Sequence, residues 1–339
     1  MKIFIRPRKS ILLYIPFVFL FLFAFAFVSH SQSFVGIASV PTDNNAQAGP
    51  TPPGIIPPGG MLAGDLVIIY GQYRGNAIPI SINQAGGQTW NTATTYSPGG
   101  PSQSIAVFWC RYNGAWGANP SISVPAGNVS AITATMYVFR PTNPNNGWGV
   151  NVVGANANSA LNPFTITGNT TTMPNTVSMA FWGTTGTSTW GGLAGAGWIK
   201  PTFPVAQTQI RNTTTGQSHT AAYNIQAGAA TLANVSQNES VVTTTLKSIV
   251  SWNELSDDDC SGAITLVPGV ACTNTAGNVA GATLSAGIPL PICGTPLYDV
   301  WYKFVATSTV ESITLSGLGA NFLTPVYKFY RVRAERSLR

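Results

Sequence analysis

Short apolar and alternating segments, separated by Gly, Pro and Asn, run from Ser33 to about Trp252. The first four are "DLVIIYG" (65–71), "IPISIN" (78–83), "SIAVFWCRY" (104–112) and "AITATMYVFR" (131–140). Because strand side chains alternate with a period of two, the last segment places Ile132, Ala134, Met136 and Val138 on one face and Thr133 and Thr135 on the other. The pattern predicts strands that turn one face toward a core.

A second set of segments repeats this order: "NTVSMAFWG" (175–183), "SHTAAYNI" (218–225) and "ESVVTTTLKSIVSW" (239–252). In both sets a strand, a Gly-rich stretch with Trp, a Gln/Thr-rich strand, a turn and a Thr-rich closing strand follow one another. "GGQTW" (86–90) and "GAGWIK" (195–200) hold equivalent places. We predict an internal duplication whose halves close on each other as sheets packed face to face, because neither half covers its own apolar face.

The expected fold class is all-β: a jelly-roll-like β-sandwich domain over 33–252, followed by a second, incomplete β-sandwich domain over 253–339. The 35 Gly and 24 Pro in 339 residues suit short strands joined by many turns and leave little room for long helices. A chain of this length has room for two or three domains.

Residues 1–32 are predicted to be a signal peptide. A basic start precedes the apolar run Ile11 to Val28, and small and polar residues follow it. The protein is therefore expected to be secreted or at the cell surface, with no membrane contact after signal removal. Because the run approaches the length that spans a bilayer, an uncleaved N-terminal anchor remains the alternative.

The net charge of +6 lies at the two ends of the chain. Four basic residues precede the apolar run, and five basic residues with Glu335 lie in the last twelve, so the body holds 16 − 4 − 5 = 7 basic and 10 − 1 = 9 acidic residues. A body with a net charge of −2 offers no basic face to phosphates. Nucleic acid is not an expected partner.

Two resemblances cover most of the exported chain. "AGDLVIIYG" (63–71), the Trp-containing Gly turns and "ITATMYVFRP" (132–141) resemble a duplicated β-sandwich module of secreted and surface proteins of bacteria, over about Pro50 to Trp252. "NELSDDDCSGAITL" (253–266), "YDVWYKF" (298–304) and "SITLSGLGANF" (312–322) resemble a β-sandwich repeat of large secreted or surface-attached proteins of gliding bacteria. In that repeat an Asn/Asp-Asp-Cys start marks each domain entry, although Asp257 replaces the Asn here. Neither resemblance implies a settled activity.

The second repeat raises two further expectations. Asp257, Asp258 and Asp259 are interpreted as the domain entry, with a calcium site that includes Asp299 as the alternative, although their spacing lacks the order of a calcium loop. The basic end "KFYRVRAERSLR" replaces the strands that the repeat should continue into. The hypothesis is a truncated or frameshifted reading frame, and the alternative is a solvated basic tail.

Residues suited to catalysis are scarce. Cys110 is expected in the core, whereas pairing among Cys110, Cys260, Cys272 and Cys293 stays open, because four Cys allow three pairings. After the signal the only histidine is His219, which is expected to be exposed on a strand. The acids from Ser33 to Trp252 are Asp43, Asp65 and Glu239, and Asp65 is interpreted as a turn residue. We expect no enzyme, no cofactor and no zinc site.

Tryptophan supplies the candidate ligand-binding residues. Trp109, Trp182, Trp252 and Trp301 lie in alternating segments and are expected in cores. Trp148 and Trp190 lie in Gly-rich polar stretches, and they are the candidates for binding a sugar ring or a protein surface, with Trp198 a weaker third. Alternatively, they fold back as lids over an end of the sandwich.

These observations favour a non-catalytic extracellular or cell-surface binding or adhesion module, as a fragment of a larger secreted protein. Its partner would be an extracellular glycan or a surface protein. The first alternative is a carbohydrate-binding accessory domain of a secreted hydrolase. The second is an enzyme with an unrecognised site.

Overall fold

The structure is a computed structural model that describes residues 32–41, 54–75, 79–98, 103–125, 132–144, 146–202, 209–214, 216–241, 243–255, 263–268, 300–306 and 312–314. Within these ranges the chain forms strands and no helix, so the predicted all-β class is confirmed. In particular, the described residues include no helix with the length and apolar character needed to cross a bilayer. Residues 1–31 of the predicted signal peptide, Cys260, Cys272, Cys293, Asp257, Asp258, Asp259, Asp299 and the basic end lie outside the described residues. Gln32, the last residue of the predicted signal peptide, is described and is buried.

The first major sheet holds five antiparallel strands in the order β1-β7-β2-β5-β4. Their bounds are β1 (Ser33–Val40), β2 (Leu66–Arg74), β4 (Asn91–Tyr96), β5 (Gln103–Arg111) and β7 (Ile132–Arg140). Its central strand β2 pairs along its length with β5 and β7, which places Ile69 between Phe108 and Met136. The apolar run of β2 is therefore buried in the middle of the sheet.

The second major sheet is also antiparallel, in the order β13-β14-β11-β16-β8. Its strands are β8 (Gly147–Val153), β11 (Thr176–Thr184), β13 (Gln209–Asn212), β14 (Gln217–Gln226) and β16 (Thr245–Leu255). A short strand, β9 (Ala157–Ser159), pairs with the start of β16 and continues the edge that β8 begins. Strand β16 runs past Trp252 to Leu255.

The strand order is the same in both halves of the chain. Replacing β1, β2, β4, β5 and β7 by β8, β11, β13, β14 and β16 converts one order into the other. A minor pair follows the same rule: β3 (Ser81–Gln84) pairs with β6 (Ser121–Ser123), and β12 (Trp190–Ala194) pairs with β15 (Val235–Glu239). "GGQTW" follows β3 and "GAGWIK" follows β12, so both stretches follow the first strand of the minor pair in their half, at equivalent places as expected. The predicted duplication is therefore present in the topology.

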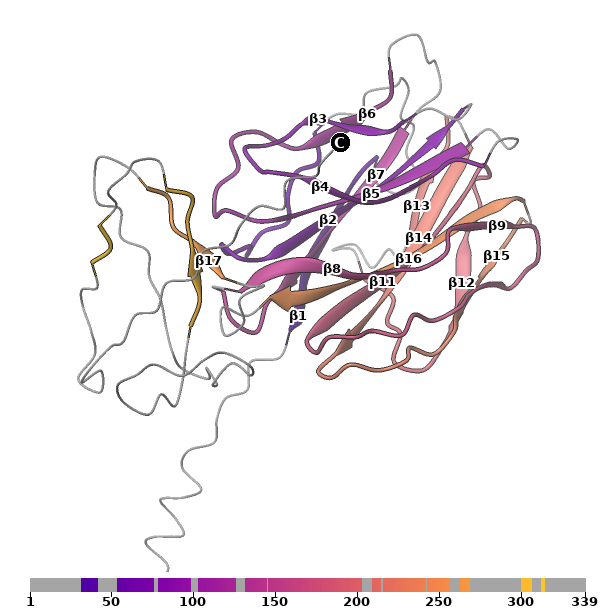
Figure 1. Ribbon diagram of the computed structural model, residues 1–339. Coiled ribbons are helices and arrows are strands. Elements are labelled where there is room, and N and C mark those ends of the chain that lie inside the picture. Colours follow the sequence, from indigo (N-terminus) through magenta and orange to yellow (C-terminus); the bar gives the residue numbers. More distant parts are fainter. Residues whose placement is uncertain are drawn as a thin grey trace, which may run out of the picture. The chain divides into compact units, whose positions relative to one another are not determined.

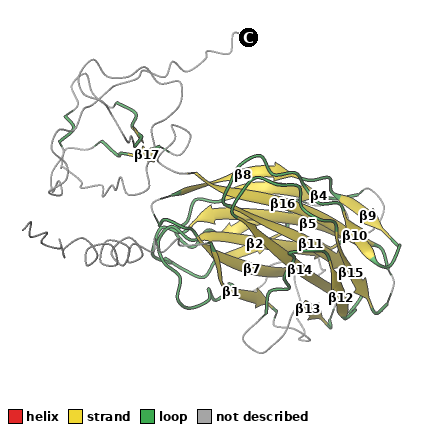
Figure 2. Cartoon of the chain, turned by 90° about the horizontal axis from the view of Figure 1, so that it is seen from below, coloured by secondary structure: helices red, strands yellow, loops and turns green. Residues whose placement is uncertain are grey.

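The two major sheets pack face to face around one apolar core (Figures 1 and 2). Leu66, Ile68 and Tyr70 of β2 and Val177 and Phe181 of β11 belong to this single cluster. The Tyr70 and Phe181 rings stack across it, with centroids 4.8 Å apart and planes 8° from parallel. Packing between the two sheets buries the alternate residues of both central strands that face inward.

The outer face of each major sheet is covered as well. The β3–β6 pair covers the outer face of the first sheet. Ile122 of β6 and Ile80, which directly precedes β3, pack on that face. The three-stranded sheet β10-β15-β12, with β10 (Phe164–Ile166), covers the outer face of the second sheet, where Trp182 is fully buried. Both faces of β7 are buried: Thr133 and Thr135, on the face opposite Ile132 and Ala134 as predicted, point into the central layer.

Several residues that the sequence predicts in a core are buried. Cys110 is a free, buried thiol on the outer side of the first sheet, and burial raises its pKa. Trp182 and Trp252 are fully buried, whereas Trp109 and Trp301 are half-buried. In the second predicted domain the described residues include only one short parallel pair, β17 (Ile264–Thr265) with β18 (Tyr302–Lys303).

Candidate functional site

Trp148 and Trp190, the candidate ligand-binding residues, are both buried, with 5% of each exposed. Trp148 lies in the central core and donates its indole N–H to the Gly64 carbonyl at 2.9 Å. Trp190 packs beside Phe164 and donates to Ser218 Oγ at 3.1 Å. The expectation of exposed aromatic faces is wrong for both. Because each indole N–H has an acceptor inside the protein, the whole ring can be buried without leaving a polar atom unpaired.

Trp198, the weaker third candidate, behaves in the same way. Its ring is 6% exposed, and its indole N–H donates to the Ala233 carbonyl at 2.9 Å. The adjacent Gly195 and Gly197 have positive φ values and let the turn bring the ring over the second sheet. The alternative that these rings fold back onto the sandwich is therefore the one that their burial supports.

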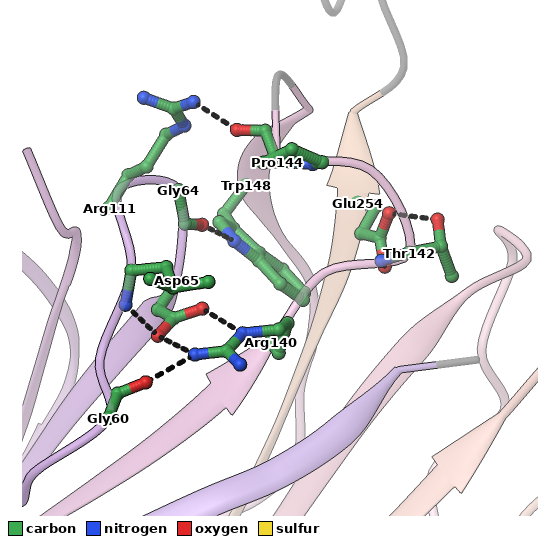
Figure 3. Close-up of polar contacts among 10 residues, drawn as sticks. Gly60, Gly64, Asp65, Arg111, Arg140, Thr142, Pro144, Trp148 and Glu254 are labelled. Atoms are coloured by element: carbon green, nitrogen blue, oxygen red, sulfur yellow. Dashed lines mark hydrogen bonds and ion pairs between the residues drawn. The ribbon is translucent and has the colours of Figure 1, made fainter. Parts of the chain in front are cut away.

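The end of the sandwich around Trp148 is held together by a charged contact (Figure 3). Asp65 precedes β2 and accepts the Leu62 N–H at 2.8 Å, so its predicted place in a turn is confirmed. The same carboxylate binds the guanidinium of Arg140 in two contacts of 3.1 and 3.2 Å. Asp65 is buried and Arg140 is about one-third exposed. This two-point geometry ties the start of β2 to the end of β7, a connection that sequence did not predict.

Glu254 lies near this contact and binds the segment that follows β7 (Figure 3). Its carboxylate accepts the Thr142 N–H at 2.7 Å, the Thr142 hydroxyl at 2.6 Å and the Asn146 amide at 2.6 Å. Arg111 donates to the Pro144 and Asn146 carbonyls, and burial lowers its pKa. Glu254 is 6% exposed, and its carboxylate binds the segment between β7 and β8 that connects the two halves of the chain.

His219 is buried in the central layer, which corrects the expectation of an exposed strand histidine. It lies between the Thr133 hydroxyl, 3.1 Å from Nδ1, and the Thr135 hydroxyl, 2.6 Å from Nε2. The ring also meets Tyr70 edge to face, at 5.1 Å between centroids. Burial lowers the pKa of His219 to about 3, so the imidazole is neutral at pH 7. One ring nitrogen donates and the other accepts, and both roles are satisfied within the protein.

Glu239 is the third acid within the described residues, after Asp65 and Glu254. It is 3% exposed and accepts hydrogen bonds from the hydroxyls of Ser188, Thr243 and Thr245. Among the described residues no group of three or more His, Cys, Asp or Glu side chains lies close enough to hold a metal ion. Every described carboxylate and the described histidine therefore take part in contacts that join strands.

Comparison with protein-family models, with curated proteins and with solved structures found no match in any of the three.

Proposed function

We propose that this chain is a non-catalytic extracellular or cell-surface binding or adhesion module, and a fragment of a larger secreted protein. The observation that supports it best is that the carboxylates and the histidine in the described part of the chain are used inside the protein. Asp65, Glu239, Glu254 and His219 are each at least nine-tenths buried and hydrogen-bonded to their own chain. A general acid or base has to reach the proton that it transfers, and these groups are already occupied by structural partners.

The packing of the sheets suits a spacer module. Two antiparallel sheets are covered on both faces and are joined through one core. In such a module the partner, an extracellular glycan or a surface protein, binds at the strand edges and loops. The apolar N-terminal run supports export, and the net charge of −2 in the body argues against nucleic acid.

The carbohydrate-binding accessory domain depended on exposed rings at Trp148 and Trp190. Their burial removes that support, so a glycan ligand would have to use other residues. We expect a glycan array to show no binding that depends on these two rings. If glycan binding were lost in a Trp148→Phe, Trp190→Phe double variant with an unchanged circular dichroism spectrum, the result would support the carbohydrate-binding accessory domain.

The non-catalytic assignment is tested by incubating the purified chain with peptide, ester and glycoside substrates. We expect product formation no faster than in a matched buffer control. Glu239→Gln and His219→Gln are the informative variants, because they change the ionisable group and keep a similar polar side chain. Turnover that follows the protein through purification and disappears in either folded variant would contradict the proposal.

A further inference from the structure

Gln32 was expected to end the signal peptide, yet its side chain belongs to the folded domain. It is 6% exposed, and its carboxamide Nε2 donates to the Asn175 carbonyl at 2.7 Å. The same carbonyl accepts the Glu254 N–H at 3.0 Å. A side chain of the first half is therefore fixed to the segment that precedes β11 and to the last part of β16. A buried and paired amide of this kind contributes to the fold, so its removal would leave the Asn175 carbonyl short of a partner.

The duplication contains a counterpart of this contact. In the strand order β8 takes the place of β1, and β11 takes the place of β2. Trp148, in the first turn of chain in β8, donates its side-chain N–H to the Gly64 carbonyl before β2. Gln32, directly before β1, donates its side-chain N–H to the Asn175 carbonyl before β11. Each contact joins one half of the chain to the other. Because Trp148 is part of the central core, its counterpart Gln32 is also part of the domain.

The residues directly after Gln32 are needed as well. Ser33 lies opposite Arg140 in the register between β1 and β7. The Phe34 ring stacks on Tyr223 of the second sheet, with centroids 5.2 Å apart. A cut after Ser33 would remove the buried amide of Gln32 and the first pair of β1. The folded domain is therefore compatible with removal of a signal peptide only if the cut lies before Gln32.

The sequence narrows the choice of bond. Signal peptidases cut after small residues that stand one and three positions before the bond, at the end of the apolar run. Between residues 21 and 34, three bonds have this spacing: Ala26–Phe27, Ser31–Gln32 and Ser33–Phe34. The first lies inside the apolar run, and the third lies inside β1. Only the bond between residues 31 and 32 follows the run and leaves the folded domain whole.

We propose that Ser31–Gln32 is a processing site, at which a signal peptidase hydrolyses the chain during export. Water adds across this peptide bond, so that Ser31 takes the new carboxylate and Gln32 takes the new α-amino group. The mature protein would begin at Gln32, one residue earlier than the sequence alone predicted. The inference rests on the export that the proposed function includes.

The test is to produce the full chain, with its own N-terminal segment, in a bacterial host that exports proteins. Cell fractionation locates the product, and tandem mass spectrometry identifies its N-terminal peptide. We expect an exported product that begins at Gln32, with the glutamine intact or cyclised with loss of ammonia. An exported product that begins at Phe27, at Phe34 or at any other residue would overturn the inference and leave export intact. So would an exported chain that keeps residues 1–31. A product that stays in the cytoplasm would contradict the proposed function as well.

Two single substitutions separate the proposed bond from the bond two residues later. Ser31→Leu places a large side chain directly before the proposed cut, so cleavage at that bond should be lost. Ser33→Leu is the matched control, because it changes the residue before the Ser33–Phe34 bond at an exposed position of β1. Cleavage after Ser31 should continue in this variant. Cleavage after residue 31 that persists in Ser31→Leu, or that is lost in Ser33→Leu, would overturn the assignment.

Discussion

Replacing Phe181 with alanine is expected to lower the free energy of unfolding by about 3 to 5 kcal/mol. Phe181 is fully buried at the centre of the second sheet and stacks on Tyr70 of the first. Alanine leaves a cavity and removes a contact between aromatic rings that contributes about 0.5 to 1.5 kcal/mol beyond area burial. Urea denaturation followed by circular dichroism measures the change.

The matched control is Thr92→Ala, at an exposed position of the edge strand β4. A surface substitution of this kind should change the free energy of unfolding by no more than about 0.5 kcal/mol. A Phe181→Ala loss as small as this would mean that the sheets do not depend on the central core for stability.

The two central strands that meet at Phe181 and Tyr70 were predicted from the sequence. The apolar runs at 65–71 and 175–183 become the central strands β2 and β11, and the repeated order of segments becomes the repeated strand order. Apolar periodicity and turn residues are local properties, so sequence carries them directly. The face-to-face packing of the two sheets was predicted from the argument that neither half of the chain covers its own apolar face.

Sequence was less informative about polar residues inside the sandwich. Thr133 and Thr135 look like the solvent side of a strand, yet they bind His219, which lies 86 and 84 residues away. Trp148 looks exposed among glycines, yet it donates to Gly64, 84 residues before it. In both cases burial depends on a partner from the other half of the chain, and no local pattern specifies such a partner.

Lowering the pH from 7 to 3 is expected to reduce the free energy of unfolding by up to about 5 kcal/mol through His219 alone. Its pKa is about 3 in the folded protein and 6.5 is the ordinary value. Between these values the unfolded chain binds a proton that the folded protein excludes. The contribution is therefore fully present above pH 6.5, is lost as the pH falls toward 3, and does not change further below 3.

The variant His219→Gln isolates this effect, because all other titrating groups are common to both proteins. The measurement is the difference in free energy of unfolding between the two proteins, from urea denaturation at pH values from 7 to 3. The parent protein should lose its advantage progressively across this range. A difference that stays constant with pH would show that His219 is not buried in its neutral form.

The central claim is that the two halves of the duplication fold as one unit around a shared core. The most direct measurement is to produce residues 32–144 and 146–255 as separate chains and record their amide NMR spectra and thermal unfolding. We expect neither chain alone to give dispersed amide signals or a cooperative transition, because each would expose one side of the cluster around Tyr70 and Phe181. A monomeric half with a dispersed spectrum and a sharp transition would contradict the account.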